Sequence, residues 1–109
     1  MATQLNWAQL CQVVNAASAV EVYGPVPSGA QVSITAASAW NPSGSAGNAV
    51  VDLFIGTSAA DATHIDRVSV APGSALPLVN AINHKLTAGM GIYAATNGAT
   101  LTVSGAIAS

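Results

Sequence analysis

Segment 61–67 (DATHIDR) holds the only cluster of titratable side chains in the sequence. In an extended strand His64 and Asp66 share one face, because side chains two residues apart point the same way. Such a pair could ligate a metal ion or act as acid and base. A metal site needs three or four ligands, however, and no other stretch supplies a second cluster. We therefore interpret the segment as the polar end of a strand and predict no metal site and no cofactor.

Other signatures of catalysis are missing from the sequence. No serine lies in a Gly-x-Ser-x-Gly elbow, and no glycine-rich loop could hold a phosphate. Four acidic residues in the whole chain argue against a hydrolase with paired carboxylates. Cys11 is the single cysteine, so we interpret it as a small buried hydrophobic residue. We predict that the protein is not an enzyme and has no catalytic residues.

The scarcity of charge is the most unusual property of the sequence. Charged residues make up 6% of the 109 residues, whereas soluble domains carry about 25%. The net charge of −2 gives nothing that could follow a phosphate backbone, so we expect no nucleic-acid partner. A surface of Ser, Thr, Asn and Gln protects poorly against self-association. We therefore predict a subunit that lives in an assembly.

The high content of apolar residues does not predict a membrane-spanning segment. The stretch after Lys85 is uncharged, but glycines interrupt it and its hydrophobic period is two. No charge occurs before Glu21, so the chain lacks the basic region of a signal peptide. We expect no membrane partner and no export by a cleaved signal.

Alternating apolar residues predict strands along most of the chain. Segment 49–55 is the most hydrophobic strand, and 31–36 alternates cleanly. In 65–70 the alternation breaks at Asp66-Arg67, which predicts a β-bulge. Strands of this kind recur every 8–12 residues between Gly/Pro turns, with no βαβ rhythm. The fold class predicted is all-β, an antiparallel two-sheet β-sandwich with the jelly roll as a variant.

The pair Asn97-Gly98 predicts a tight turn, because a type I′ turn needs positive φ at both central positions. We expect a hairpin in which 91–96 pairs with 99–104. One face of that hairpin would be apolar and the other small and hydroxylated, and a slip of one residue would invert both faces.

The first 19 residues are ambiguous between a helical turn and an extended segment. Val13 and Val14 favour the extended form through their branched β-carbons. We predict an N-terminal arm over 1–19, held by a neighbouring subunit, and a β-sandwich domain over 20–109.

Several large apolar residues are candidates for contacts between subunits. Trp40 either covers the edge of the core or makes an exposed contact. Phe54 and Asp52 are on the side of strand 49–55 that would point away from the core. A phenylalanine there indicates that this outward side is covered as well. The predicted interface residues are Leu5, Trp7, Leu10, Trp40, Val50, Phe54 and Tyr93.

The order of turns and strands resembles that of small virion proteins of tailed bacteriophages, variously head fibre, decoration or tail-associated proteins. The resemblance covers most of 20–109. It is carried by Val22-Tyr23, Val26-Pro27-Ser28-Gly29, Val32-x-Ile34, the Asn41 loop, Val51-x-Leu53-x-Ile55, 65–70, Ala71-Pro72-Gly73-Ser74, Leu86-x-Ala88-Gly89, Ile92-Tyr93-Ala94 and Gly105-x-Ile107. Here Gly24-Pro25 alters the Tyr-x-Val-Pro spacing usual in those proteins.

The resemblance implies a non-enzymatic subunit that forms trimers or other symmetric oligomers on the particle. We expect a capsid decoration or cement protein, made in the host cytoplasm and carried on the virion surface. Its partners would be copies of itself and the major capsid protein or other virion proteins. The alternative is a tail, collar, fibre or baseplate component that binds the host surface.

Overall fold

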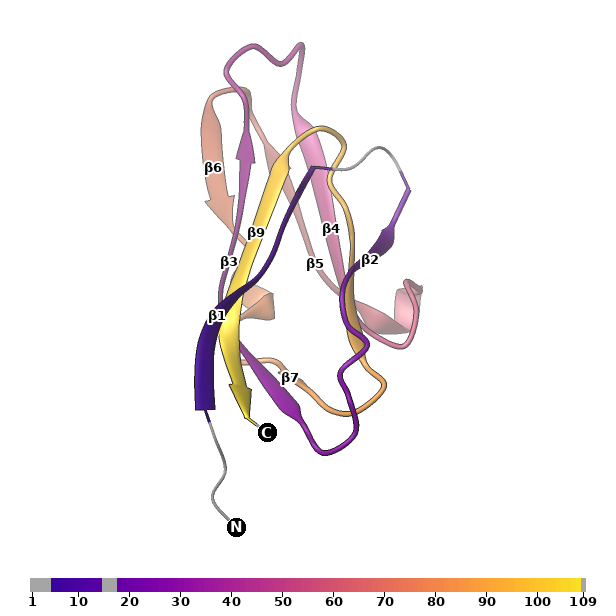
Figure 1. Ribbon diagram of the computed structural model, residues 1–109. Coiled ribbons are helices and arrows are strands. Elements are labelled where there is room, and N and C mark those ends of the chain that lie inside the picture. Colours follow the sequence, from indigo (N-terminus) through magenta and orange to yellow (C-terminus); the bar gives the residue numbers. More distant parts are fainter. Residues whose placement is uncertain (1–4, 15–17, 109) are drawn as a thin grey trace.

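The computed structural model describes residues 5–14 and 18–108, and this part of the chain is all-β. Two single-turn 3₁₀ helices, η1 (Asp61–Thr63) and η2 (Val79–Ala81), interrupt the strands shown in Figure 1. The strands are β1 (Leu5–Val14), β2 (Val20–Tyr23), β3 (Gln31–Asn41), β4 (Ala49–Gly56), β5 (His64–Val70), β6 (Ser74–Pro77), β7 (Lys85–Leu86), β8 (Gly91–Ala95) and β9 (Thr100–Ala108).

The strands form two antiparallel sheets packed face to face (Figure 1). Sheet A has the order β1-β9-β3-β6, with the short β7 also paired to β3, and sheet B has the order β2-β8-β4-β5. Apart from β7, the strands pair in a nested order along the chain: β1 pairs with β9, β2 with β8, β3 with β6, and β4 with β5. This is the order of a jelly roll, so the predicted sandwich is confirmed in its jelly-roll form.

The core lies between the sheets and follows the alternation of the strands. In β4, Val51 and Leu53 are completely buried between half-buried neighbours, and in β9 Leu101 and Val103 repeat the pattern. Each such aliphatic side chain stabilises the fold by about 1.5–3 kcal/mol. The fully buried large apolar side chains are Ile34, Leu53, Leu78, Leu86, Ile92, Leu101, Val32, Val51, Val70 and Val103.

Strand β1 is extended, as expected for the N-terminal segment, but the strand that holds it is β9 of its own chain rather than the predicted neighbouring subunit. It pairs antiparallel with β9 along its whole length. The register runs from Leu5 opposite Ala108 to Val14 opposite Thr100, with a β-bulge between Gln9 and Cys11. This strand therefore forms one edge of sheet A (Figure 1). Residues 1–4 and 15–17 lie outside the described residues, and the division of the chain at residue 19 stays a prediction.

The hairpin predicted around Asn97-Gly98 is wrong, although the turn itself is present. Both residues have positive φ, +51° and +92°, and the Ala99 amide donates to the Thr96 carbonyl over 3.0 Å. The strands on either side do not pair, because β8 lies in sheet B and β9 in sheet A. Both strands bury their apolar faces in the same core, β8 from one sheet and β9 from the other. The alternation of apolar residues is therefore the same for a turn between sheets as for a hairpin.

Strand β5 carries the predicted β-bulge, one residue before the expected place. Leu53 pairs with Asp66 and Phe54 with His64, so Ile65 has no partner in the register. The extra residue returns Val68 and Val70 to the parity that faces the core, and Val70 is completely buried.

Asn41 fixes the end of β3, within a segment that was predicted to be a loop. Its side chain is 1% exposed. Its Nδ2 donates to the carbonyls of Val70 (2.8 Å) and Gly47 (3.0 Å), and its Oδ1 accepts from Ser45 Oγ at 2.7 Å. This buried amide therefore ties the end of β5 to the loop that follows β3.

Candidate interaction surface

The charged residues are divided unequally between the two sheets. Strands β1, β9, β3 and β6, which make up the main path of sheet A, contain no charged residue. Asp61, in η1, lies outside those four strands. Lys85, on the two-residue β7, is the cross-strand partner of Ser33 on β3, so it lies on the outward side of sheet A at the rim of those four strands. The other charged residues lie on the strands of sheet B: Glu21, Asp52, Asp66 and Arg67.

The outward side of these strands of sheet A is defined by the strand register, and we call it the uncharged face. Leu101 and Val103 of β9 point into the core, so the residues between them point out. The partners of those residues on β1 and β3 share this side. The uncharged face comprises Leu5, Trp7, Gln9, Gln12, Val14, Gln31, Ser33, Ala36, Ser38, Trp40, Thr100, Thr102, Ser104, Ala106 and Ala108.

Large apolar side chains stand at both ends of the uncharged face. Leu5 and Trp7 are 53% and 70% exposed at one end, and Val14 and Trp40 are 61% and 45% exposed at the other. Val14 and Trp40 are both partners of Thr100 in the register, so they flank β9 from either side. Exposed apolar clusters of this kind mark contact sites in soluble proteins.

The middle of the uncharged face is polar but small. Gln12 Nε2 donates to Thr102 Oγ1, and Thr35 Oγ1 donates to the Ser104 carbonyl, both over 3.3 Å. Short hydroxyl side chains on β9 and β3, with Gln9 and Gln12 on β1, form the middle of the face between its apolar ends. Such a surface can approach another surface without burying an unpaired ion, which is costly.

Six of the seven predicted interface residues separate into two groups on opposite sides of the sandwich, and the seventh, Leu10, packs against the core. Leu5, Trp7 and Trp40 stand exposed on the uncharged face, so Trp40 does not cover the core edge. Leu10 lies at the bulge of β1 and is half-buried. The remaining three are half-buried on the outward side of sheet B: Val50, Phe54 and Tyr93. Their role in subunit contacts stays a prediction.

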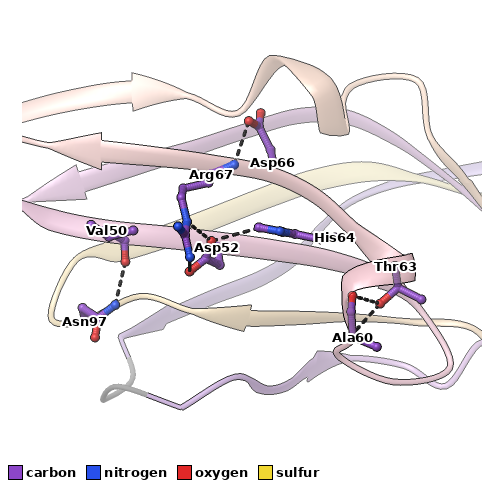
Figure 2. A network of polar contacts seen from close by, with 8 residues as sticks. All are labelled: Val50, Asp52, Ala60, Thr63, His64, Asp66, Arg67 and Asn97. Carbon is purple, nitrogen blue, oxygen red and sulfur yellow. Dashed lines mark hydrogen bonds and ion pairs between the residues drawn. The ribbon is translucent and has the colours of Figure 1, made fainter.

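The outward side of sheet B carries a network of ionisable groups centred on Asp52 (Figure 2). Arg67 Nε donates to Asp52 Oδ1 over 2.6 Å, and His64 Nε2 lies 2.9 Å from the same oxygen. Only 13% of the Asp52 side chain is exposed, against 65% of Arg67. The hydrogen bond to Asp52 and the negative charge of Asp52 together raise the pKa of the Arg67 guanidinium. The two side chains thus form an ion pair between β4 and β5.

The sequence placed His64 and Asp66 on one face of a strand, and this is wrong. The bulge at Ile65 sets the two residues on opposite sides of β5, where His64 pairs with the outward Phe54 and Asp66 with the buried Leu53. Asp66 accepts hydrogen bonds from the backbone amides of Arg67 (2.9 Å) and Asn80 (3.1 Å), while His64 turns toward Asp52. Asp52 was missed because it comes from the neighbouring strand β4, and only the strand register brings it beside β5. In the described residues, no group of three or more His, Cys, Asp or Glu side chains could hold a metal ion.

An aromatic cluster lies next to this network. The rings of Phe54 and His64 stack with their centroids 4.6 Å apart and an interplanar angle of 24°. Tyr93 is the cross-strand partner of Phe54 on β8, and its hydroxyl donates to the Thr57 carbonyl over 3.0 Å. Desolvation, followed by the hydrogen bond and charge of Glu21, raises the pKa of the Tyr93 phenol. The outward side of sheet B thus combines aromatic rings with charged groups.

All aromatic Trp, Tyr and Phe residues of the chain lie on strands. They are Trp7 on β1, Tyr23 on β2, Trp40 on β3, Phe54 on β4 and Tyr93 on β8. The loops of the described chain contain no aromatic residue of these three types. The loops are therefore poor candidates for a site that stacks on ligand rings.

The described part of the chain contains no helix that is long and apolar enough to cross a membrane.

No protein-family model and no curated protein sequence matches the chain. Solved structures of infectious bursal disease virus do align with it. A chain of the T13 viral particle is 12% identical, with a TM-score of 0.45 over 97% of this chain and 30% of that one. Chains from the Gx and Gt strains are 11% and 12% identical, with TM-scores of 0.44 and 0.42, over 99% and 97% of this chain.

The chain spans about a third of the length of these viral chains, 33% for the Gx strain and 31% for the Gt strain. None of them is a bacteriophage protein, and the resemblance to tailed-bacteriophage virion proteins stays a prediction.

Proposed function

We propose that the protein is a non-enzymatic structural subunit of a virus particle, joined to neighbouring subunits through its uncharged face. The observation that carries the proposal is that the four main strands of one sheet lack charge while presenting Trp7 and Trp40 to solvent. A chain that acts alone would need ionised groups on that face to stay dispersed.

The size of this face suits a stable contact. Strand lengths and spacings give it a planar area of roughly 500 Å² before side-chain relief is counted. A standard protein interface buries about 800 Å² on each partner, so the face and its rim are of the right order. Tryptophan is among the residues that carry most of the energy of such contacts. Burying the four main strands of this face removes apolar surface from water, and its one neighbouring charge, Lys85 beside Ser33, lies at the rim, where it stays in contact with water.

The virion part of the proposal comes from the order of turns and strands that resembles small tailed-bacteriophage proteins. Within that class we propose a capsid decoration or cement subunit on the particle surface, synthesised in the host cytoplasm. Its partners would be copies of itself, as a trimer, and the major capsid protein or other virion proteins. The jelly roll is compatible with this role but does not imply it, because one fold hosts many functions.

Particle binding tests this proposal. Purified protein is mixed with particles of the source virus that lack it, and the copies that sediment with each particle are counted. We expect Trp7→Lys and Trp40→Lys to lower occupancy at least tenfold. Ser69→Lys is the control, because Ser69 is exposed on β5 of the opposite sheet. Full occupancy of both tryptophan variants, or none for the wild-type chain, would refute the proposal.

One observation supports the alternative, a tail, collar, fibre or baseplate component that binds the host surface. Phe54, His64 and Tyr93 lie together on the outward side of sheet B, beside Asp52 and the other charged groups. Aromatic rings next to carboxylates and amides are suited to binding sugars. Cell binding that Tyr93→Ala abolishes and Trp7→Lys leaves intact would favour this role over the first.

A further inference from the structure

Each sheet of the sandwich has two edges, and three of these four edges carry a feature that prevents pairing with another chain. Strands β6 and β7 share one edge of sheet A: β6 is four residues long and ends at Pro77, and β7 is two residues long and carries Lys85. Strand β2 is also four residues long and has a register shift. Strand β5 carries Asp66 and Arg67 and a β-bulge. Short length, proline, charge and bulges are the usual protections of sheet edges.

The fourth edge, β1, lacks most of these protections. It is ten residues long and contains neither a charged residue nor a proline. Its one irregularity is the bulge at Leu10. Asn6 and Ala8 point away from the uncharged face, yet both are exposed, as are Leu5 and Trp7 on the other side. The first half of β1 is thus open on both of its faces, and within the described chain its outer edge has no paired strand.

We propose that β1 pairs antiparallel with β1 of a second copy across a two-fold axis, which joins two copies of sheet A into one continuous sheet. The inference rests on the proposed function in that it names a second copy of this chain as one partner in the assembly, and it adds a two-fold contact at this edge to the three-fold contacts of the proposed trimer. Two-fold contacts of identical surfaces are the commonest symmetry of homo-oligomers. An unpaired strand edge supplies the backbone donors and acceptors for such a contact.

The sequence of β1 fits this symmetry in one register. When residue i faces residue 19 − i of the second copy, Leu5 faces Val14 and Trp7 faces Gln12, all on the uncharged face. On the other side Ala8 faces Cys11. The bulge at Leu10 is what makes this possible, because it reverses the parity of the strand at its midpoint. The two bulges then meet at the two-fold axis, where Gln9 faces Leu10. The four facing pairs on either side of the bulge, from Leu5–Val14 to Ala8–Cys11, each share a side of the sheet.

Pairing in this register places no like charges opposite each other, since β1 is uncharged. It sets two apolar Leu5–Val14 pairs on the uncharged face, and both residues are more than half exposed in the single chain. Apolar pairs directly opposite each other stabilise antiparallel strands. The uncharged faces of the two copies would form one surface of twice the area, available to a third component of the particle.

Spin-label distances test this arrangement. Labels are attached at Gln9→Cys on β1, or at Ala75→Cys on β6, each in a Cys11→Ala background. With strands about 4.8 Å apart, edge pairing puts the β1 labels within about 25 Å of each other and the β6 labels more than about 30 Å apart. A monomer at every concentration up to about 1 mM, or β1 labels farther apart than β6 labels, would overturn the proposal.

Two lysine variants separate this inference from the proposed function. Ala8→Lys places charge on the edge strand but away from the uncharged face, and we expect the dimer to be lost. Ser38→Lys places charge in the middle of the uncharged face, and we expect the dimer to persist while particle binding falls. A dimer that survives Ala8→Lys would contradict edge pairing. A dimer that forms but never binds particles would contradict only the proposed function.

Discussion

Trp7 and Trp40 stand on the same side of sheet A, at opposite ends of the uncharged face. Their partners on β9 are Ala106 and Thr100, six positions apart, which separates the two rings by about 20 Å. They are the two tryptophans of the chain, 70% and 45% exposed. Both of the largest side chains of this small domain therefore lie on one exposed surface whose main strands carry no charge, and we propose that this surface is covered in the particle.

The Asn97-Gly98 turn is tested by replacing the glycine. Gly98 has φ of +92°, and a Cβ added there would meet no atom within 4 Å, so any cost is conformational. We expect Gly98→Val to lower the free energy of unfolding by about 1–2 kcal/mol, measured by urea denaturation. Gly44→Val is the control, because that loop glycine has open space and no positive φ. Equal stabilities for the two variants would disprove the assigned turn.

The Asn41 amide is predicted to be the most sensitive polar group of the fold. Asn41→Ala would leave the Val70 and Gly47 carbonyls without their donor in a buried place. We expect a loss of about 2–3 kcal/mol in unfolding free energy, since each abandoned buried group costs about 1–3 kcal/mol. Asn48→Ala, which removes one exposed hydrogen bond of 3.3 Å to Ser69, should cost less than about 0.5 kcal/mol. A loss below 1 kcal/mol at Asn41 would show that this amide is dispensable.

Burial raises the pKa of the Cys11 thiol from 9.0 to about 11. The folded protein therefore holds this proton more tightly than the unfolded chain does. The corresponding stability is complete below pH 9 and is lost as the pH rises to about 11, a drop of about 2–3 kcal/mol. Tyr23 and Tyr93, whose pKa values are also raised, add to the decline at higher pH. Urea unfolding at intervals from pH 8 to 11 measures it.

Cys11→Ala isolates the thiol in this pH experiment. The variant should keep only the later decline that comes from the two tyrosines. If its stability fell between pH 9 and 10 as steeply as that of the wild-type chain, the decline would have another source.

The period of the apolar residues predicted most of the fold. Alternation in 49–55 and 99–104 marked strands whose inward residues, such as Leu53 and Leu101, are completely buried. The spacing of turns predicted a sandwich, and the break at Asp66-Arg67 predicted the bulge in β5. These features depend on local sequence, because the pleat of a strand fixes which residues share a face.

What the sequence did not predict depends on contacts between distant segments. The Asn97-Gly98 turn has the same local conformation whether it closes a hairpin or links two sheets, so its neighbours could not decide between them. His64 meets Asp52 only because β4 and β5 pair in a bulged register. The uncharged face likewise appears only when β1, β9 and β3 lie side by side, far apart as they are in the chain.

The solvent exposure of the two tryptophans tests the central claim most directly. The chain is labelled with 5-fluorotryptophan, and the shift of each ¹⁹F resonance between H₂O and D₂O is measured in the dilute subunit and in the assembled particle. Burial of the uncharged face predicts that both Trp7 and Trp40 show the solvent shift when free and lose most of it on assembly. Two resonances that keep their full solvent shift in the particle would contradict the claim.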